Sequence, residues 1–370
     1  MIQMNRESTP EPSPRAWIDV DLGALLRNAR RTSEQAQRPL ILMVKADAYG
    51  IGAVPVARTL EVLDPYAYGV ATVEEGAELR AAGINRPIIL FTPSHVGELE
   101  RIAAAKITPA LCRAESIRAW VALGGGDWHL AIDTGMHRSG ASWDEIDALA
   151  DSLRASPPAG VFTHFHSAEL DDGSLEIQEQ RFREALGRLP ERDKPPIIHA
   201  DNSAALMRRT PSPWDAVRPG VFLYGVGSGA HAAVQPEQVA HLRARVVALR
   251  DVKPGETVSY GATWRAEGLR RVATLACGYA DGYRRSLSNT GRALIGGHEV
   301  PVVGVVTMDM TMIDVTDLPC ELGDVATLLG TAGSKTLTAE QVAWLANLSP
   351  YELLTGLRQR LPRHYSGGAQ

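Results

Sequence analysis

The amino-acid sequence predicts an α/β fold, in which a (β/α)8 TIM-type barrel is followed by a mostly β C-terminal domain. Short apolar runs alternate with helical patterns from residue 22 to residue 218, and there are eight such runs. Strand–helix alternation implies a parallel sheet, and eight units favour a closed barrel over an open, doubly wound sheet. No GxGxxG motif follows the first run, so the dinucleotide-binding alternative lacks its sequence fingerprint.

Length and composition are typical of a soluble protein with two domains. The 370 residues carry a net charge of −5, and 45% of them are hydrophobic and 22% charged. Both signs of charge are spread along the chain, so we expect no nucleic-acid partner and no membrane surface. Cys112, Cys277 and Cys320 lie far apart without ligand spacing, which predicts neither disulfides nor a metal site. Without an apolar run of signal-peptide or membrane-spanning length, a cytoplasmic protein is expected.

The barrel is predicted at residues 16–232, after a flexible, polar and proline-rich segment at residues 1–15. A helical pattern spans Leu22–Ala36, and capping boxes at Thr72–Glu75 and Ser142–Glu145 each predict the start of a helix. The eight strands are expected at Leu40–Val44, Ala67–Ala71, Pro87–Phe91, Thr108–Cys112, Trp128–Asp133, Gly160–His164, Pro196–His199 and Asp215–Arg218.

The second domain is predicted at residues 233–370. Val239–Val252 alternates like an exposed strand, and turn residues such as Gly296-Gly297 separate the β-rich runs that follow. A third capping box, Thr338–Gln341, predicts a late helix. The β-rich runs are Val272–Cys277, Val300–Val306, Thr311–Val315 and Asp324–Leu329.

Polar side chains gather where the barrel strands end. They are Lys45, Tyr49, Asp133, Arg138, His164, His166, His199, Asn202, Ser203 and Arg218, and the apolar Met136 lies between Asp133 and Arg138. The carboxyl ends of the strands form the face that carries the active site in this fold, so such clustering indicates function. Lys45 alone could simply mark the point where a strand reaches water, and its polar neighbours favour the functional interpretation.

The last two of these loops suggest a cofactor. Small residues at Ser203 and Gly220 would let backbone amides approach an anion, as in the phosphate site common to barrels. A phosphate site that faces a strand-end lysine suggests pyridoxal phosphate, whose aldehyde forms a Schiff base with lysine. Gly220 could also be only a turn glycine, so this argument alone leaves both interpretations open.

The chain resembles the fold-type III pyridoxal-phosphate enzymes, and alanine racemases most closely. Eight motifs in the order of that family carry the resemblance, and they extend over nearly the whole chain beyond residue 16. They are Val44-Lys-Ala-Asp-Ala-Tyr-Gly50, Asp133-Thr-Gly-Met-His-Arg138, Thr163-His-Phe165, Asn202-Ser203, Val217-Arg-Pro-Gly220, Ser259-Tyr-Gly-Ala-Thr263, Cys277-Gly-Tyr-Ala-Asp-Gly282 and Met308-Asp309.

The resemblance implies a role for each matching residue. Lys45 would hold the cofactor and act as one catalytic base, and Tyr260, supplied by the second subunit of a homodimer, would be the opposite base. Arg218 would face the pyridine nitrogen. The other cofactor-binding residues would be Tyr49, His164, Asn202, Ser203, Gly220 and Val221. Arg138, Met308 and Asp309 would contact the substrate, and Tyr279 and Arg285 would line its access channel.

The implied reaction interconverts L-alanine and D-alanine and supplies D-alanine for peptidoglycan. Racemisation removes the Cα proton from one face and returns one on the other, so two bases should flank the substrate. A tyrosine with a pKa of about 10 needs positive charge or hydrogen bonds nearby to act as a base, and His164 and Arg138 are candidates. An arginine at the pyridine nitrogen keeps its own proton, which weakens the ring as an electron sink and should suppress transamination.

Four positions depart from the family pattern. Ala131 replaces a lysine that braces the arginine at 138, Val305 replaces an arginine beside the channel, and Thr307 replaces a cysteine. Gln359 stands where some relatives place a phosphate-binding tyrosine. Because channel positions differ, a broader or serine-preferring racemase is an alternative. A pyridoxal-phosphate carrier without turnover is another, although the second domain with Tyr260 argues against it.

Overall fold

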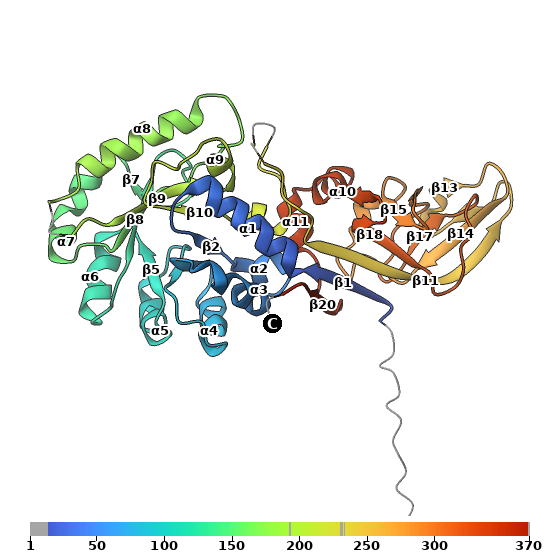
Figure 1. Ribbon diagram of the computed structural model, residues 1–370, viewed down its shortest axis with the longest axis horizontal. Coiled ribbons are helices and arrows are strands. Elements are labelled where there is room, and N and C mark those ends of the chain that lie inside the picture. The colour runs from blue at the N-terminus through green and yellow to red at the C-terminus, as the bar shows by residue number, and fades with distance from the viewer. Residues whose placement is uncertain (1–13, 192–193, 230–231, 233, 369–370) are drawn as a thin grey trace, which may run out of the picture. The chain divides into compact units, whose positions relative to one another are not determined.

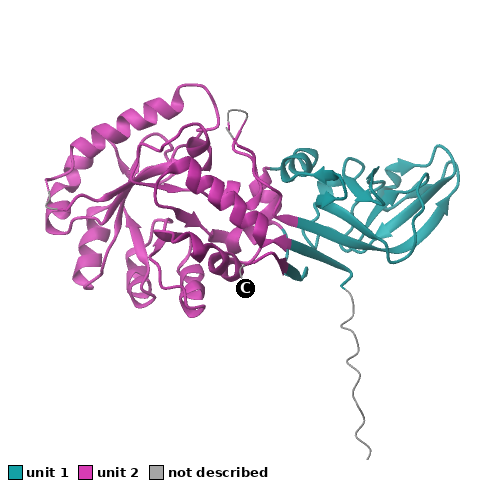
Figure 2. Ribbon diagram, in the orientation of Figure 1, with its two compact units in different colours: residues 1–19, 241–348, 357–364 teal, residues 20–240, 349–356, 365–370 magenta. Residues whose placement is uncertain are grey.

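The computed structural model describes residues 14–191, 194–229, 232 and 234–368. Its residues form two compact units, which Figure 2 draws in teal and magenta. Unit 1 contains the described residues up to 19 together with 241–348 and 357–364, and unit 2 contains 20–240, 349–356 and those from 365 on. The expected domain boundary between residues 232 and 233 stays a prediction.

Unit 2 is a parallel barrel, as the sequence predicts. Its strand order is β10-β9-β8-β6-β5-β4-β3-β2, and an isolated parallel bridge between Leu40 and Val217 joins the two ends of that row. The N–H of Met43 also donates to the carbonyl oxygen of Pro219 over 3.1 Å. The strands are β2 Ile41–Met43, β3 Ala67–Val70, β4 Ile88–Leu90, β5 Thr108–Leu111, β6 His129–Asp133, β8 Gly160–Phe162, β9 Ile197–Asn202 and β10 Ala216–Arg218.

Continuous apolar runs form these strands because both faces of the sheet are covered. Ile41, Ala67, Ile89 and Ala216, from four different strands, pack together with essentially no exposure. Helices lie around the outside of the strands (Figure 1). They are α1 Leu22–Ala36, α3 Ala53–Leu60, α4 Val73–Ala81, α5 Leu99–Ala104, α6 Ala114–Ala122, α7 Ala150–Ala155, α8 Ser174–Gly187 and α9 Ser203–Met207.

Two of the three predicted capping boxes are present. Thr72 and Glu75 cap α4, and Thr338 and Gln341 cap α10 (Ala339–Ala346). The prediction for Ser142 is wrong, because Ser142 ends the two-residue strand β7 (Ala141–Ser142) and donates its hydroxyl to the carboxylate of Asp144. The helical turn begins later, with η3 at Ile146–Leu149.

A second, mostly antiparallel sheet lies largely in unit 1, as expected for a β-rich domain. Its central row is β16-β15-β18-β11-β1-β20, with β14, β17 and β19 attached. The bounds are β1 Ala16–Asp21, β11 Ala240–Val252, β14 Arg270–Leu275, β15 Arg292–Ile295, β16 His298–Pro301, β17 Thr311–Asp314, β18 Val325–Ala332, β19 Lys335–Leu337 and β20 Arg363–Ser366. The strand expected at Val300–Val306 is shorter than predicted, because Gly304 turns the chain with a φ of 76°.

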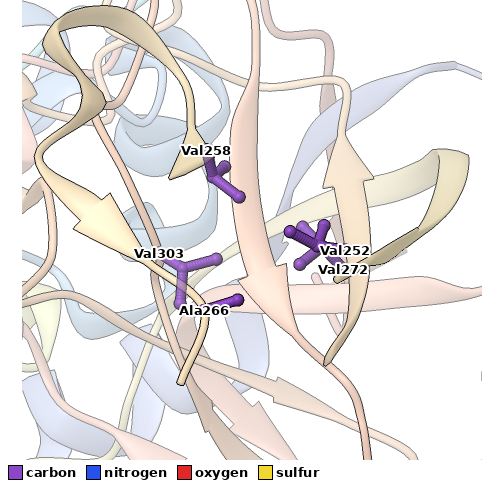
Figure 3. Close-up of a cluster of buried hydrophobic side chains, with 5 residues drawn as sticks. All are labelled: Val252, Val258, Ala266, Val272 and Val303. Atoms are coloured by element: carbon purple, nitrogen blue, oxygen red, sulfur yellow. The ribbon is translucent and has the colours of Figure 1, made fainter. Parts of the chain in front are cut away.

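A small hairpin in unit 1 is fixed by its own apolar cluster. Its strands are β12 Thr257–Val258 and β13 Trp264–Arg265, and they pair antiparallel. Val258 and Ala266, at the ends of the hairpin, pack with Val252, Val272 and Val303 (Figure 3). The turn between the two strands, η5 (Tyr260–Ala262), is therefore tied to the body of unit 1.

None of the helices formed by the described residues has the length and apolar character required to span a membrane.

Candidate active site

A cavity of about 710 Å³ opens in unit 2 at the carboxyl ends of the barrel strands. Nine residues that the sequence assigns to cofactor or substrate line it together with the wall residues Met43 and Phe91. These nine are Lys45, Tyr49, Arg138, His164, Asn202, Ser203, Arg218, Gly220 and Val221. Polar groups at strand ends thus converge on one space.

Lys45 begins a compact left-handed turn directly after β2. Ala46, Asp47, Ala48 and Tyr49 all have φ between 50° and 56°, within the segment α2 (Lys45–Gly50). L-residues in this conformation cost roughly 1–2 kcal/mol each, so neighbouring groups must hold the turn. Its two ends present Lys45 and Tyr49 to the same cavity.

One of these neighbours is the helix α11 (Pro350–Thr355), which comes from far along the chain. A Cβ added at Gly50 would lie 2.6 Å from the carbonyl oxygen of Leu354, and Gly50 has a φ of 88°. Only glycine tolerates both the close approach and the positive φ. The left-handed turn therefore packs directly on the backbone of α11.

The surroundings of Lys45 favour the neutral form of its amine. Burial lowers its pKa, and the positive charges of Arg138 and Arg218 lower the pKa further, while Glu75 opposes them. A lower pKa increases the fraction of neutral amine at pH 7, which is the form that attacks an aldehyde.

Tyr49, Ser203 and Gly220 lie together at the cavity and form a small cradle of hydroxyl and backbone groups. The N–H of Gly220 donates to the hydroxyl oxygen of Ser203 over 2.9 Å, and a Cβ at Gly220 would lie 2.6 Å from the hydroxyl of Tyr49. Tyr49 stacks on Tyr224 with ring centroids 4.6 Å apart, and Tyr224 donates its hydroxyl to the carbonyl oxygen of Met43 over 2.7 Å. Burial raises the pKa of Tyr49, so its hydroxyl keeps its proton and can donate.

Arg218 lies buried in the wall of the cavity and is held by carbonyl oxygens and histidines. Nη1 donates to the carbonyl oxygen of His199, and Nη2 donates to those of Thr163 and Ala200, over 2.6, 2.6 and 3.0 Å. Arg218 lines the cavity, and among the described residues none accepts a hydrogen bond from its Nε. Burial lowers the pKa of Arg218 to about 9, which still leaves the guanidinium protonated at pH 7.

His164 is neutral at physiological pH. Burial lowers its pKa to about 3, with further lowering by Arg218, Arg138 and Lys45. Its Nδ1 lies 3.3 Å from Nη2 of Arg218, which has no lone pair to offer, so Nδ1 accepts and the proton lies on Nε2. His164 can therefore stabilise a phenolate by donating a hydrogen bond, but it does not supply the positive charge considered from the sequence.

Arg138 has no bracing group within the described chain. Its side chain is exposed, and no described residue accepts a hydrogen bond from it. Ala131, in the position of the expected lysine, packs in a small apolar cluster with Ala110 and Phe162. Ala131 and Arg138 both line the cavity, so the wall at residue 131 is apolar.

The remaining predicted residues lie in unit 1. Tyr260 occupies the η5 turn and is 73% exposed, and Met308 is 53% exposed. The carboxylate of Asp309 accepts a hydrogen bond from Arg360 over 2.8 Å. Backbone hydrogen bonds from Tyr279 to Thr307 and from Ala280 to Met308 connect the last two predicted motifs, and Arg285 begins η6 (Arg285–Leu287).

Tyr351 is a cavity residue that the sequence analysis did not identify. It lies on α11, lines the cavity, and its ring centroid is 6.4 Å from that of Tyr49. Gln359 is not among the residues that line this space. The local sequence signal that could have pointed to Tyr351 is Ser349-Pro350. This pair predicts the start of a helix but does not indicate which unit the helix joins.

Fold and site together define a barrel enzyme of the pyridoxal-phosphate type, with a strand-end lysine, an anion cradle and a buried arginine around one cavity. The model of the alanine racemase N-terminal domain matches residues 20–228, and that of the alanine racemase C-terminal domain matches residues 239–365. The chain belongs to the alanine racemase family, whose members are isomerases that depend on pyridoxal phosphate.

Relatives match over nearly the whole chain. An alanine racemase of Sorangium cellulosum is 39% identical over 94% of this chain and 98% of its own, and one of Symbiobacterium thermophilum is 37% identical over 95% and 97%. The structure of the Streptomyces lavendulae alanine racemase superimposes with a TM-score of 0.90 at 31% identity, covering 97% of this chain and 99% of its own.

Two further structures hold ligands. The Bacillus anthracis alanine racemase, with bound L-Ala-P, has a TM-score of 0.87 and 32% identity, and covers 96% of both chains. The Bartonella henselae alanine racemase, with covalently bound pyridoxal phosphate, has a TM-score of 0.87 and 29% identity, and covers 96% of this chain and 100% of its own.

Proposed function

We propose that this enzyme interconverts L-alanine and D-alanine by a two-base mechanism, with pyridoxal phosphate held covalently by Lys45. The observation that carries the proposal is the position of Lys45, whose pKa is lowered, in the wall of a cavity that also contains the Tyr49–Gly220 cradle and Arg218. The names of the relatives and the ligand L-Ala-P in the Bacillus anthracis structure support alanine as substrate.

The cavity residues fit this cofactor at both of its ends. Tyr49, Ser203, Gly220 and Val221 would surround the phosphate, with the hydroxyl groups of Tyr49 and Ser203 and the N–H of Val221 as donors. The N–H of Gly220 holds the hydroxyl oxygen of Ser203, and glycine at 220 leaves room beside the hydroxyl of Tyr49. The available Nε of Arg218 would donate to the pyridine nitrogen. His164 and Asn202 would complete the wall. When bound, pyridoxal phosphate supplies an electron sink for the negative charge that proton removal leaves on Cα.

Lys45 would move the Cα proton on one face of the substrate. Its lowered pKa leaves more neutral amine to accept that proton, and the same group returns a proton in the reverse direction. Arg138, at the open side of the cavity, would bind the substrate carboxylate with its exposed guanidinium.

The second base would be Tyr260 of the partner subunit in a head-to-tail homodimer. The exposure of Tyr260 and Met308 supports this arrangement, because exposed apolar side chains are available to a partner. The apolar cluster at the base of the hairpin would hold Tyr260 in a fixed position. Asp309, Tyr279 and Arg285 would contribute to the same site or to its access channel. The product D-alanine would supply peptidoglycan synthesis, and the enzyme would act in the cytoplasm.

The test measures conversion of L-alanine and L-serine, followed by chiral chromatography, with and without added pyridoxal phosphate. Formation of D-alanine that depends on the cofactor and exceeds that of D-serine supports the proposal. Faster serine turnover would instead make the protein a serine-preferring racemase. Absence of any α-proton exchange in deuterated water would make it a cofactor carrier without turnover.

A further inference from the structure

Glu75 reaches from helix α4 to the left-handed turn behind Lys45. One of its carboxylate oxygens accepts a hydrogen bond from the N–H of Ala46 over 2.7 Å. The other accepts from the N–H of Ala71, at the end of β3, over 2.7 Å and from Thr72 over 3.3 Å. A single carboxylate therefore joins the end of the neighbouring strand to the residue that follows Lys45.

Capping of α4 explains only one of these two oxygens. In the capping box, the hydroxyl oxygen of Thr72 accepts from the N–H of Glu75, and Glu75 returns one oxygen to the N–H of Thr72. The oxygen that accepts from Ala46, Oε1, takes no part in capping α4. It satisfies the N–H of Ala46, one of the first donors of a helical turn, which have no partner within the turn itself.

The turn needs such a partner because it is intrinsically unfavourable. Four successive L-residues from Ala46 to Tyr49 have positive φ. The N–H of Ala48 donates to the carbonyl oxygen of Val44 over 2.8 Å, whereas the N–H of Ala46 donates to the side chain of Glu75. Loss of the Glu75 contact would release the turn at the end that carries Lys45. Tyr49, at the other end, would lose its fixed separation from Lys45.

We propose that Glu75 is a positioning residue for the cofactor lysine, which holds the left-handed turn so that Lys45 and Tyr49 grip opposite ends of one cofactor. The inference rests on the proposed role of Lys45. The carboxylate also opposes the effect of the two arginines on the pKa of Lys45, which gives the contact an electrostatic signature.

The chain offers variants that separate positioning from helix capping. Glu75→Asp keeps the charge and a local cap but is one methylene too short to reach Ala46. Glu75→Gln keeps the length, but its amide has one acceptor oxygen and would turn a donor towards an N–H. Glu74→Gln is the matched control, because Glu74 is the neighbouring residue on α4 and pairs with Arg101 at the surface.

The experiment titrates each apoprotein with pyridoxal phosphate and follows the absorbance of the lysine-bound cofactor. We expect the dissociation constant to rise at least tenfold in Glu75→Asp and Glu75→Gln, and to stay within twofold of wild type in Glu74→Gln. In Glu75→Gln, the acid limb of the pH profile of cofactor capture should also move to lower pH, because the pKa of Lys45 falls when the carboxylate charge is removed.

Two outcomes would overturn the positioning role. One is unchanged cofactor affinity in both Glu75 variants, even if their thermal unfolding midpoints fall, since that result would reduce Glu75 to a helix cap. The other is an equal loss of affinity in Glu74→Gln. Wild-type apoprotein that fails to capture the cofactor would overturn the proposed function itself, so the two failures are distinguishable.

Discussion

Arg218 donates a hydrogen bond from Nη1 to Nδ1 of His199 over 3.0 Å, and this contact fixes the tautomer of a buried histidine pair. Because arginine cannot accept, the proton of His199 lies on Nε2, which is 2.8 Å from Nδ1 of His129. His129 accepts that proton in a hydrogen bond and is also neutral. Burial lowers the pKa of His129 to about 3 and that of His199 well below its usual value, with a further contribution from Arg218.

This pair should make the protein sensitive to acid. Folded His129 stays neutral down to a pH of about 3, whereas unfolded histidine binds a proton below about 6.5, so the unfolded state takes up more protons in this window. The free energy of unfolding should therefore fall by up to ~1.4 kcal/mol per pH unit for each such histidine as the pH falls from 6.5 towards 3.

Urea unfolding between pH 4 and 7 measures that slope. His129→Gln should make it shallower by about one proton, because glutamine can still accept from His199 but does not titrate. The control is His298→Gln, an exposed histidine in β16, which should leave the slope unchanged. An unchanged slope in His129→Gln would show that His129 is already protonated in the folded protein at these pH values.

Arg138 should influence how readily Lys45 captures the cofactor. The positive charge of Arg138 lowers the pKa of Lys45; this effect is smaller than that of burial and larger than that of Arg218. Arg138→Gln should therefore raise the pKa of Lys45 and reduce the fraction of neutral amine at pH 7. The capture rate should fall by roughly threefold, and high salt should shrink the difference, because Arg138 is exposed and its charge is screened. Stopped-flow absorbance measures the rate, with Arg154→Gln on α7 as control. A faster rate in Arg138→Gln would contradict this account.

The cradle formed by Gly220 and Tyr49 can be tested by a double-mutant cycle. Gly220→Ala would place a Cβ 2.6 Å from the hydroxyl of Tyr49 but 3.5 Å from the ring carbon that bears it. Gly220→Ala alone should weaken cofactor binding by about 1–3 kcal/mol, in the range of an overpacked site. Once Tyr49→Phe removes the hydroxyl, adding the alanine should cost little more.

Equilibrium titration with pyridoxal phosphate gives the four affinities of that cycle. Gly126→Ala is the matched control, since a Cβ there meets no atom within 4 Å. Strictly additive losses would mean that Gly220 and the hydroxyl of Tyr49 do not share one space.

A shared active site predicts complementation between two inactive variants. Lys45→Ala should lose the absorbance of the lysine-bound cofactor, whereas Tyr260→Phe should keep it and lose most racemisation, because only its proton-transferring hydroxyl is removed. A mixed dimer of the two contains one site with both bases intact. Co-expression with two affinity tags isolates that dimer, and an L-alanine assay measures its activity. A purified mixed dimer without activity would refute the contribution of Tyr260 from a partner subunit.

The barrel could be predicted from the sequence because its strands are buried on both faces and therefore read as uninterrupted apolar runs. The cavity residues of unit 2 could be found for a related reason, since parallel strands place their ends at one rim. The left-handed turn could not be predicted, because Ala46, Ala48 and Tyr49 have no intrinsic preference for positive φ. Tertiary contacts from Glu75 and α11 determine it.

Tyr351 shows a second limit. Its helix follows more than a hundred residues of unit 1, and only the return of residues 349–356 to unit 2 brings it into the cavity. Nothing in local composition marks that return. The capping box at Thr72–Glu75 shows a different case. The local pattern correctly predicts the start of α4, but the sequence does not reveal that Glu75 also accepts a hydrogen bond from the N–H of Ala46.

The late position of α11 has a consequence for biosynthesis. All eight strands of the barrel lie before residue 219, yet one wall of the cavity is made by residues 349–355. A chain that leaves the ribosome from its N-terminus exposes Lys45 long before the helix that supports its turn has been translated. Completion of the cavity therefore has to wait until residues 349–355 have left the ribosome.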